Sequence, residues 1–529
     1  MNITRRDFLK TAGAAGVALQ TSSLFSQADA LGTAPPQAKP MNVVILLNDQ
    51  HAHDVLGCAG FPRLQTPAAD QLAADGIRFS QAVCVSTPCL PSRHNLFHGL
   101  PSFQTGVYTN LHCLPLDCIP AITMGKAFKQ ADYATAAFGK MHWFPYQADV
   151  PRGNYFGFDQ RAGHQYESGE LMETNYVKEH PDLRKKQRQE WIEHGLHGDG
   201  GDSCAAAFKG WHSPMPSSQS REWWIAQQSA RFIATPRNRP FLMVSSLPGP
   251  HAPHVVPSDF ADLYNPQDVV LPEAPPDGLP DANAYREFKG LTREDLKVVI
   301  ANYMGFVSAC DASHAQVIKA LKDTGQYDDT LIIFAADHGE LLGSRGVTAF
   351  SKYNLYERAI RFPLIIKPPK SFSGAWAGSV NPTLVSMLDL LPTVMDFANL
   401  PGKEKLPGIS LKPLFTNGAL ERKHKVTVTE FSPSVYLSFR SAEWKLIIGP
   451  HGEELYHLRE DPNEFKNLAG DPQYSGRIAE LKTQGLEEMR FGDPVYSPRI
   501  AELRTQNLEE MRLTSQNFGK RCMEYRRAS

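Results

Sequence analysis

The chain has 529 residues, of which 42% are hydrophobic and 21% are charged, as in a globular protein with a sizeable core. Its formal net charge of -2 argues against a nucleic-acid-binding protein, because binding to a phosphate backbone normally requires a basic surface. Domains average about 150 residues, but large α/β domains exceed that scale, and we therefore expect one large unit and one smaller one.

The N-terminal residues predict an export signal. Residues 4–10 (TRRDFLK) match a twin-arginine signal, a short apolar run follows at 11–19, and residues 28–30 (ADA) suit cleavage by signal peptidase. We predict a signal peptide over residues 1–30, recognised by the twin-arginine export machinery, and a periplasmic or extracellular location. The apolar run is too short to span a bilayer, and we expect no membrane span in the mature chain.

Three continuous apolar runs predict strands that are buried on both faces of a sheet: residues 41–47 (MNVVILL), 240–246 (PFLMVSS) and 330–335 (TLIIFA). Helical patterns lie between them, for example at 67–75 and 296–321. Strands that alternate with helices predict an α/β fold with a large, mixed but mostly parallel sheet flanked by helices.

Two further segments interrupt this pattern. Residues 176–221 are polar and predict a surface insertion that is helical in part. Residues 266–280 contain five prolines and predict an extended connector.

Prolines and glycines return near residues 400–414, and we place the large unit at 40–415 and a C-terminal subdomain at 416–529. Residues 425–430 (KVTVTE) and 444–448 (WKLII) predict strands of a small antiparallel sheet. Residues 470–490 and 492–512 are near copies with a period of 22 residues. Two copies are too few for a solenoid, so they indicate duplication of one terminal helix.

Polar clusters follow the buried strands. Asp49 and Gln50 follow the first strand, and Asp337 and His338 follow the third. Active sites of open α/β sheets lie at the carboxyl ends of the strands. Together these side chains form an oxygen-rich, partly imidazole set that suits a divalent cation. Taken alone, an Asp after a strand is as readily explained as a turn or a helix cap.

Cys89 is one of eight cysteines, which form no CxxC pair and so argue against a zinc ribbon. It stands just before residues 91–97 (PSRHNLF), where we expect a helix to start, with Arg93 one turn further in. Free backbone N–H groups and the helix dipole favour an anion there. Without its neighbours, Cys89 would be interpreted as a buried structural cysteine, and disulfide pairing cannot be deduced from the sequence.

Four more polar residues lie after strands or in turns. Lys140 and His142 follow a strand-like run at 133–138, His251 lies in a PHAP turn, and Lys352 follows the DHGE run by about a dozen residues. Singly, each lysine is explained as a solvated surface charge and each histidine as a core or turn residue.

The ordered set of these runs resembles the formylglycine-dependent sulfatases of the alkaline-phosphatase-like superfamily, and is closest in motif to choline-sulfatase-like and iduronate-sulfatase-like members. The matching runs are VILLNDQ, CLPSRHNLFHG, FGKMHW, PGPHAPH, DHGELLGSRG and LYHLREDPNEFKNLA. They extend from Asn42 to about Ala469, nearly the whole mature chain. The cysteine run is the most specific, since Cys, Pro and Arg at this spacing are what the family's modifying enzyme recognises.

The resemblance implies an alkaline-phosphatase-like fold and hydrolysis of a sulfate ester, in a sulfated carbohydrate or a small organic sulfate. It also implies that a formylglycine-generating enzyme converts Cys89 to formylglycine. One hydroxyl of the hydrated aldehyde would attack sulfur and displace the alcohol, leaving a sulfate hemiacetal. The other would expel the sulfate by C–O cleavage after losing its proton.

The resemblance further implies a role for each matching position. The metal ligands would be Asp49, Gln50, Asp337, His338 and the modified Cys89. Arg93 and Lys140 would steady the formylglycine hydrate, and His142 would be the base for its collapse. His251 and Lys352 would bind the sulfate oxygens, and one of them would protonate the leaving oxygen.

Gln50 is a departure, because the family often has two adjacent acids at this position. A neutral amide oxygen can still coordinate, so we expect Ca²⁺ and leave Mn²⁺ and Mg²⁺ open. Asp-Gln also occurs in choline-sulfatase-like and phosphonate-monoester-hydrolase-like relatives, so phosphonate monoester or phosphodiester hydrolysis is the alternative activity. Asn110 is a candidate substrate contact, and His51 and His53 are candidates for the rim of the site.

A carbohydrate-binding or signalling protein that has lost activity is disfavoured, because each expected catalytic position is filled. The physiological substrate, endo or exo action and the oligomeric state are not specified by these motifs.

Overall fold

The computed structural model describes the chain in segments, which span residues 41–110, 122–144, 156–163, 176, 178–194, 209–273, 292–346, 352–372, 374, 376–416, 420, 426–431, 436–449 and 452–490. The predicted signal peptide and the second copy of the terminal repeat lie outside the described residues.

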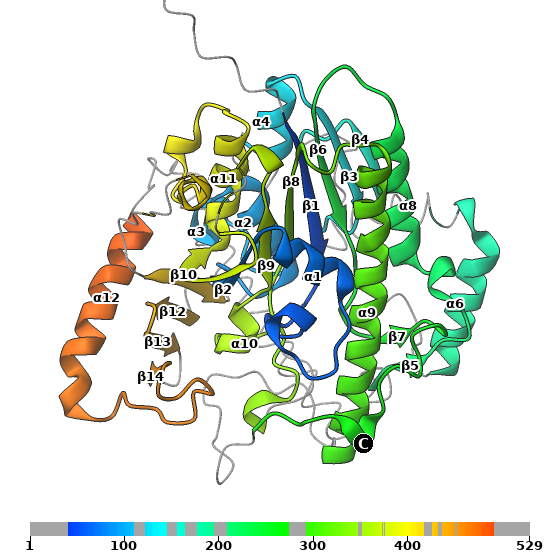
Figure 1. The fold of residues 1–529 in the computed structure, drawn as a ribbon. Coiled ribbons are helices and arrows are strands. Elements are labelled where there is room, and N and C mark those ends of the chain that lie inside the picture. Colours follow the sequence, from blue (N-terminus) through cyan, green and yellow to red (C-terminus); the bar gives the residue numbers. More distant parts are fainter. Residues whose placement is uncertain are drawn as a thin grey trace, which may run out of the picture. The chain divides into compact units, whose positions relative to one another are not determined.

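A mixed eight-stranded sheet forms the centre of the fold, in the order β10-β2-β9-β8-β1-β6-β3-β4. The strands are β1 (Asn42–Asn48), β2 (Ile77–Val83), β3 (Ala134–Gly139), β4 (Gln160–Gly163), β6 (Phe241–Ser246), β8 (Thr330–Ala336), β9 (Leu364–Lys367) and β10 (Ser379–Ser386). Strand β1 pairs in parallel with β6 and β8, whereas β9 runs antiparallel to β8 and β2. The three predicted buried strands are thus confirmed as the neighbours at the middle of the sheet (Figure 1).

Two helical layers cover this sheet, and strand β1 shows why. Val43, Ile45 and Leu47 pack into one hydrophobic cluster, and Val44 and Leu46 pack into another, because successive side chains of a strand point to opposite faces. The first cluster includes residues of α2 (Cys89–His98), α4 (Met124–Gln130) and α11 (Leu390–Phe397). The second includes residues of α1 (Pro67–Ala74), α8 (Arg221–Ala234) and α9 (Arg293–Asp323).

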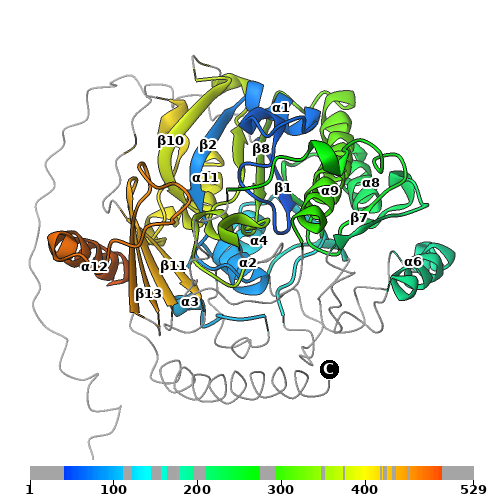
Figure 2. The same cartoon turned by 90° about the horizontal axis from the view of Figure 1, so that it is seen from below.

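A four-stranded antiparallel sheet forms the C-terminal region, in the order β11-β12-β13-β14. Its strands are β11 (Thr427–Phe431), β12 (Tyr436–Arg440), β13 (Trp444–Gly449) and β14 (Gly452–His457). Helix α12 (Ser475–Arg490) packs beside this sheet through Leu481 and forms the first copy of the repeat (Figure 2). The predicted antiparallel strands are therefore confirmed, while the boundary at residue 416 stays a prediction.

A buried ionic cluster joins a short helix to the C-terminal sheet. Glu357 of the short helix α10 (Glu357–Ile360) lies 3.0 Å from the Arg440 guanidinium and 3.3 Å from the Lys445 ammonium. All three side chains are almost fully buried. Charges buried to this degree are stable only when paired, so the C-terminal sheet is fixed against the segment that follows Lys352.

The remaining described α-helices and β-strands are short or lie in the predicted insertion. They are α3 (Ser102–Thr105), α6 (Pro181–Glu193), β5 (Trp211–His212) and β7 (Val255–Val256). Helix α6 agrees with a partly helical insertion. Within the described ranges no helix is both long and apolar enough to cross a membrane.

Candidate active site

The carboxyl ends of β1 and β8 place the central acids side by side. The two strands pair in parallel up to Asn48 and Ala336, so the next residues, Asp49 and Asp337, leave the sheet together. The Asp337 N–H donates to the Asn48 carbonyl at 3.1 Å, and the Gln50 N–H donates to the Asp337 carboxylate at 3.0 Å. The two polar clusters predicted from separate strands therefore form one structural unit.

Four potential metal ligands converge at this edge. Ligand atoms of Asp49, Cys89, Asp337 and His338 all lie within 4.8 Å of one another, and all four residues are buried. Two carboxylates, one imidazole and one sulfur position suit a divalent cation, because buried carboxylates need a positive partner. The donor set therefore fits the predicted metal.

Cys89 is the first residue of α2, directly after the capping residue Pro88. Its sulfur lies 3.0 Å from Lys352 Nζ, 3.2 Å from His338 Nε2 and 3.6 Å from an Asp49 oxygen. Burial and Asp49 would raise the pKa of the thiol, but Lys352, Lys140 and His338 hold this pKa well below its usual value. Position 89 is thus built to stabilise a negatively charged group.

Arg93 and Lys140 bind the two central carboxylates. Arg93 donates from Nε to Asp337 and from Nη2 to Asp49, both at 2.9 Å, and Lys140 Nζ lies 2.8 Å from Asp49. The structure therefore shows these two cations against the metal-ligand candidates, where they fix the carboxylate orientation.

The two carboxylates respond differently to this environment. Burial alone would raise the pKa of Asp49, but Lys140, His251 and Arg93 lower it well below its usual value. Burial and the nearby Asp49 charge raise the pKa of Asp337 to about 7. Two adjacent buried carboxylates repel each other, and a divalent cation between them would remove that repulsion.

Lys352 and His251 form the side of the site that reaches solvent. Lys352 Nζ lies 2.8 Å from His251 Nε2 and donates to Gln50 Oε1 at 2.9 Å. Lys352 is buried, whereas the His251 side chain is 33% exposed. Burial and the Lys352 charge lower the pKa of His251. A substrate anion entering past His251 would meet the Lys352 ammonium.

His142 and Gln50 share an uncommon backbone conformation, with φ of 49° and 56°. Positive φ is rare for residues other than glycine and is found preferentially where function requires it. His142 is buried, and this burial lowers its pKa to about 4. Its imidazole is therefore neutral near pH 7.

The other three candidates have structural partners. Asn110 accepts the Leu90 N–H at 2.9 Å, so its side chain supports the first turn of α2. His51 is fully buried, contacts Asn48 and Val55 at 3.0 and 2.8 Å, and does not lie at an exposed rim. His53 lies 3.9 Å from Asp54 and is mostly buried.

Sequence reasoning did not assign a role to Glu340, although it lies in the DHGE run. Its carboxylate is fully buried and accepts hydrogen bonds from Gln50 Nε2 and from the Leu342 N–H. The neighbouring Gly339 leaves no room for a side chain. A Cβ at this position would clash with two backbone carbonyl oxygens, at 2.1 Å from that of Arg358 and 2.2 Å from that of Arg361.

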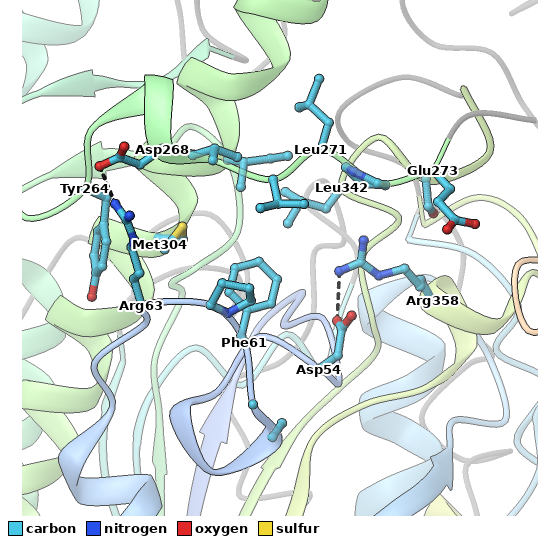
Figure 3. Close-up of a pocket in the computed structure, with 18 of the residues that line it drawn as sticks. Asp54, Phe61, Arg63, Tyr264, Asp268, Leu271, Glu273, Met304, Leu342 and Arg358 are labelled. Atoms are coloured by element: carbon cyan, nitrogen blue, oxygen red, sulfur yellow. Dashed lines mark hydrogen bonds and ion pairs between the residues drawn. The ribbon is translucent and has the colours of Figure 1, made fainter.

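A separate pocket of about 390 Å³ lies next to the loop that follows β1, but neither Cys89 nor Lys352 lines it. Phe61, Met304 and Leu342 form its apolar middle (Figure 3). Four of its charged side chains pair with one another, since Asp54 binds Arg358 at 2.8 Å and Arg63 binds Asp268. We place the chemistry at Cys89 because the ionisable groups converge there.

Family models match most of the chain. The model described as Sulfatase matches residues 41–400, and the model described as N-sulphoglucosamine sulphohydrolase, C-terminal, matches residues 346–491. The twin-arginine translocation signal model matches residues 2–21 and confirms the predicted export signal.

The four cysteines among the described residues (Cys58, Cys84, Cys89 and Cys310) are all free thiols.

Individual relatives agree with the family models. An ulvan-active sulfatase of Formosa agariphila is 26% identical over 87% of this chain and 83% of its own. A choline-sulfatase of Rhizobium meliloti is 28% identical over 85% of this chain and 86% of its own. The phosphonate monoester hydrolase structure of Agrobacterium radiobacter has a TM-score of 0.67 at 22% identity, over 84% of this chain and 96% of that one. This structural likeness confirms the predicted fold class.

Proposed function

The chain belongs to the sulfatase family of sulfuric ester hydrolases, and within it we propose hydrolysis of a sulfated carbohydrate or small organic sulfate at Cys89. The observation that supports this most strongly is the position of Cys89 at a helix N-terminus. There it lies between the carboxylate and imidazole set on one side and the Lys352 ammonium on the other. Such a pocket matches an anionic group that reacts beside a cation.

Formylglycine at position 89, made by a formylglycine-generating enzyme, would supply a hydrated aldehyde whose hydroxyl is the nucleophile. A divalent cation would supply positive charge that favours ionisation of this hydroxyl. We propose that Asp49, Asp337, His338 and Gln50 hold the cation with residue 89. Oxygen-rich ligation favours Ca²⁺, with Mn²⁺ or Mg²⁺ as alternatives.

Arg93 and Lys140 act through the carboxylates that they bind. Both cations contact Asp49, and Arg93 also contacts Asp337, so the two carboxylates cannot rotate freely. Metal affinity and the alignment of the reacting groups depend on this fixed arrangement.

Lys352 and His251 bind the sulfate oxygens in this proposal. Lys352 keeps its proton because the negative charges of Cys89 and Asp49 raise its pKa and outweigh the opposing effect of burial. His251 lies beside it on the exposed side, where the leaving alcohol must exit. One of the two protonates the leaving oxygen, and His142, neutral near pH 7, accepts the proton that accompanies sulfate release.

Mass spectrometry of the peptide containing Cys89, taken from active exported protein, tests the formylglycine step. We expect the aldehyde in the active fraction and no sulfatase activity in Cys89→Ala. An intact thiol in fully active protein would exclude this mechanism.

Hydrolysis of a phosphonate monoester is the second candidate, supported by Gln50 and by the shared fold with a phosphonate monoester hydrolase. Rates on an aryl sulfate and on an aryl phosphonate monoester, measured side by side, separate the two. A higher kcat/KM for the sulfate supports the first proposal, and an equal or higher value for the phosphonate supports the second.

A further inference from the structure

Glu340 is a buried acid at the site that has no role in the steps above. It lies three residues after Asp337, and its side chain is completely shielded from solvent. One carboxylate oxygen accepts from Gln50 Nε2, and the other accepts from the Leu342 N–H at 2.9 Å. Glu340 therefore contacts the one residue that departs from the family's usual pair of acids.

The backbone of Gln50 is already fixed by other groups. Tyr303 donates its hydroxyl to the Gln50 carbonyl at 2.9 Å and accepts the Ala52 N–H at the same distance. The Gln50 N–H donates to the Asp337 carboxylate. With both the N–H and the carbonyl of Gln50 bonded, the remaining question is which end of the side-chain amide faces which neighbour.

The two neighbours of that amide allow only one answer. An ionised carboxylate accepts hydrogen bonds and cannot donate them, so Glu340 must face the NH₂ end of Gln50. An ammonium donates and cannot accept, so Lys352 must face Oε1, which it contacts at 2.9 Å. Rotating the amide by half a turn would place oxygen against carboxylate and NH₂ against ammonium.

We propose that Glu340 is a positioning residue of the active site: through Gln50, it sets the position of the Lys352 ammonium that contacts Cys89. The chain of hydrogen bonds runs from the Glu340 carboxylate through the Gln50 amide to Lys352 Nζ, which lies 3.0 Å from Cys89 Sγ. A carbonyl oxygen has two lone pairs, so Oε1 that accepts from Lys352 keeps one for a cation. This inference deepens the proposed function and rests on it.

Exchanging the partners tests the pairing. Gln50→Glu alone sets two carboxylates against each other and should lower kcat/KM on an aryl sulfate by about 100-fold, the cost of a buried unpaired charge. Glu340→Gln alone lets the two amides pair in either orientation and should lower kcat/KM by about 10-fold. In Q50E/E340Q the amide and the acid have changed places, and we expect activity within about 10-fold of wild type.

Rescue is the informative result. If Glu340 only stabilised the loop at Leu342, adding E340Q to Q50E would not restore activity. The loss of kcat/KM in the double variant would then equal the product of the losses in the two single variants. That outcome overturns the proposal. A Q50E protein that fails to fold alone but folds as Q50E/E340Q supports the pairing equally well, and circular dichroism with thermal unfolding shows which case applies.

Action through Lys352 has its own test. In a Lys352→Met background, E340Q should change kcat/KM by less than about twofold, because the group that it positions is gone. A full 10-fold loss in that background would show that Glu340 acts by another route and would overturn the proposal.

A matched control is Glu190→Gln. Glu190 is also a buried carboxylate with two acceptor contacts, from Trp211 Nε1 at 2.6 Å and Ser213 Oγ at 3.1 Å. E190Q should lower the Tm without changing kcat/KM.

A readout without substrate separates this inference from the proposed function. Thermal unfolding of each variant is measured without a cation and again with CaCl₂. In both conditions we expect Q50E to have a lower Tm than wild type and Q50E/E340Q to have a Tm close to that of wild type. If wild type hydrolyses no sulfate ester, the proposed function fails while this measurement still decides the pairing.

Discussion

Lys352→Met is the most direct test of the site. Methionine keeps an unbranched apolar stem in the buried position and removes only the ammonium. The change deletes the contacts of Nζ to Cys89, His251 and Gln50, which measure 3.0, 2.8 and 2.9 Å. Each of these contacts lies within the site, so the change is confined to it.

The expected loss is large because Lys352 is only 5% exposed. Removing one donor that stabilises charge in a water-excluded site costs about 3–4 kcal/mol in the transition state. At about 1.4 kcal/mol per tenfold, kcat/KM should fall between about 10²- and 10³-fold. The free energy of unfolding should fall by about 1–3 kcal/mol, the cost of leaving Gln50 Oε1 without its buried donor, while Arg93 and Lys140 still neutralise Asp49.

Two substrates with different leaving groups define what Lys352 does. An aryl sulfate releases a stable phenolate, whereas an alkyl sulfate needs its leaving oxygen protonated. An equal loss on both substrates indicates sulfate binding, and a larger loss on the alkyl sulfate indicates proton donation. A kcat/KM within about threefold of wild type on both would refute the placement of Lys352 in the site.

Three other predictions concern the scaffold and the cation. Gly339→Ala should destabilise the protein by more than about 3 kcal/mol in urea unfolding, because its Cβ would overlap the carbonyl oxygens of Arg358 and Arg361. Glu357→Gln should cost about 3–5 kcal/mol by leaving Arg440 without its buried partner. The charges of Arg440 and Lys445 outweigh the effect of burial and lower the pKa of Glu357. The stabilisation by ionised Glu357 is therefore present above about pH 4.3 and is lost as the pH falls below that value. In unfolding curves measured over a series of pH values, the variant should lose less stability than wild type in this acid range. Chelation of divalent cations should abolish turnover and lower the Tm, and CaCl₂ at about 100 times its Kd should restore about 2.7 kcal/mol of stability; an unchanged Tm and rate after chelation would exclude a resident cation.

The central sheet was predictable because its strands are buried on both faces. An unbroken apolar run such as residues 41–47 is best buried as a strand inside a sheet that is covered on both faces. The polar residues that follow such parallel strands then lie at one edge of the sheet. The same reasoning predicts that Asp49 and Asp337 lie together at this edge of the sheet. The contacts of individual side chains were less accessible, because Arg93 and Lys140 bind carboxylates that come from distant segments of the chain.

What sequence reasoning missed are residues whose function depends on contacts between distant segments. Glu340 and Gln50 are 290 positions apart, and only the folded chain shows that the acid faces the amide. Glu357 of α10 likewise pairs with Arg440 of β12, which is distant in the sequence. A buried charge has no periodic signature in a sequence, because its partner can come from any part of the chain.

Net charge does not separate a sulfate ester from a phosphonate monoester, because each has a single negative charge near neutral pH. The two differ in hydrogen-bond acceptors: a sulfate ester presents three terminal oxygens, and a phosphonate monoester presents two and a carbon substituent. The groups that contact Cys89 Sγ include Lys352, His338 and Asp49, all polar, and Lys352 is in turn bonded to Gln50 and His251. A carbon group turned toward this surface would leave a buried donor unpaired, at a cost of about 1–3 kcal/mol. We therefore propose sulfate rather than phosphonate as the group that reacts at Cys89, even with a neutral Gln50 beside Asp49.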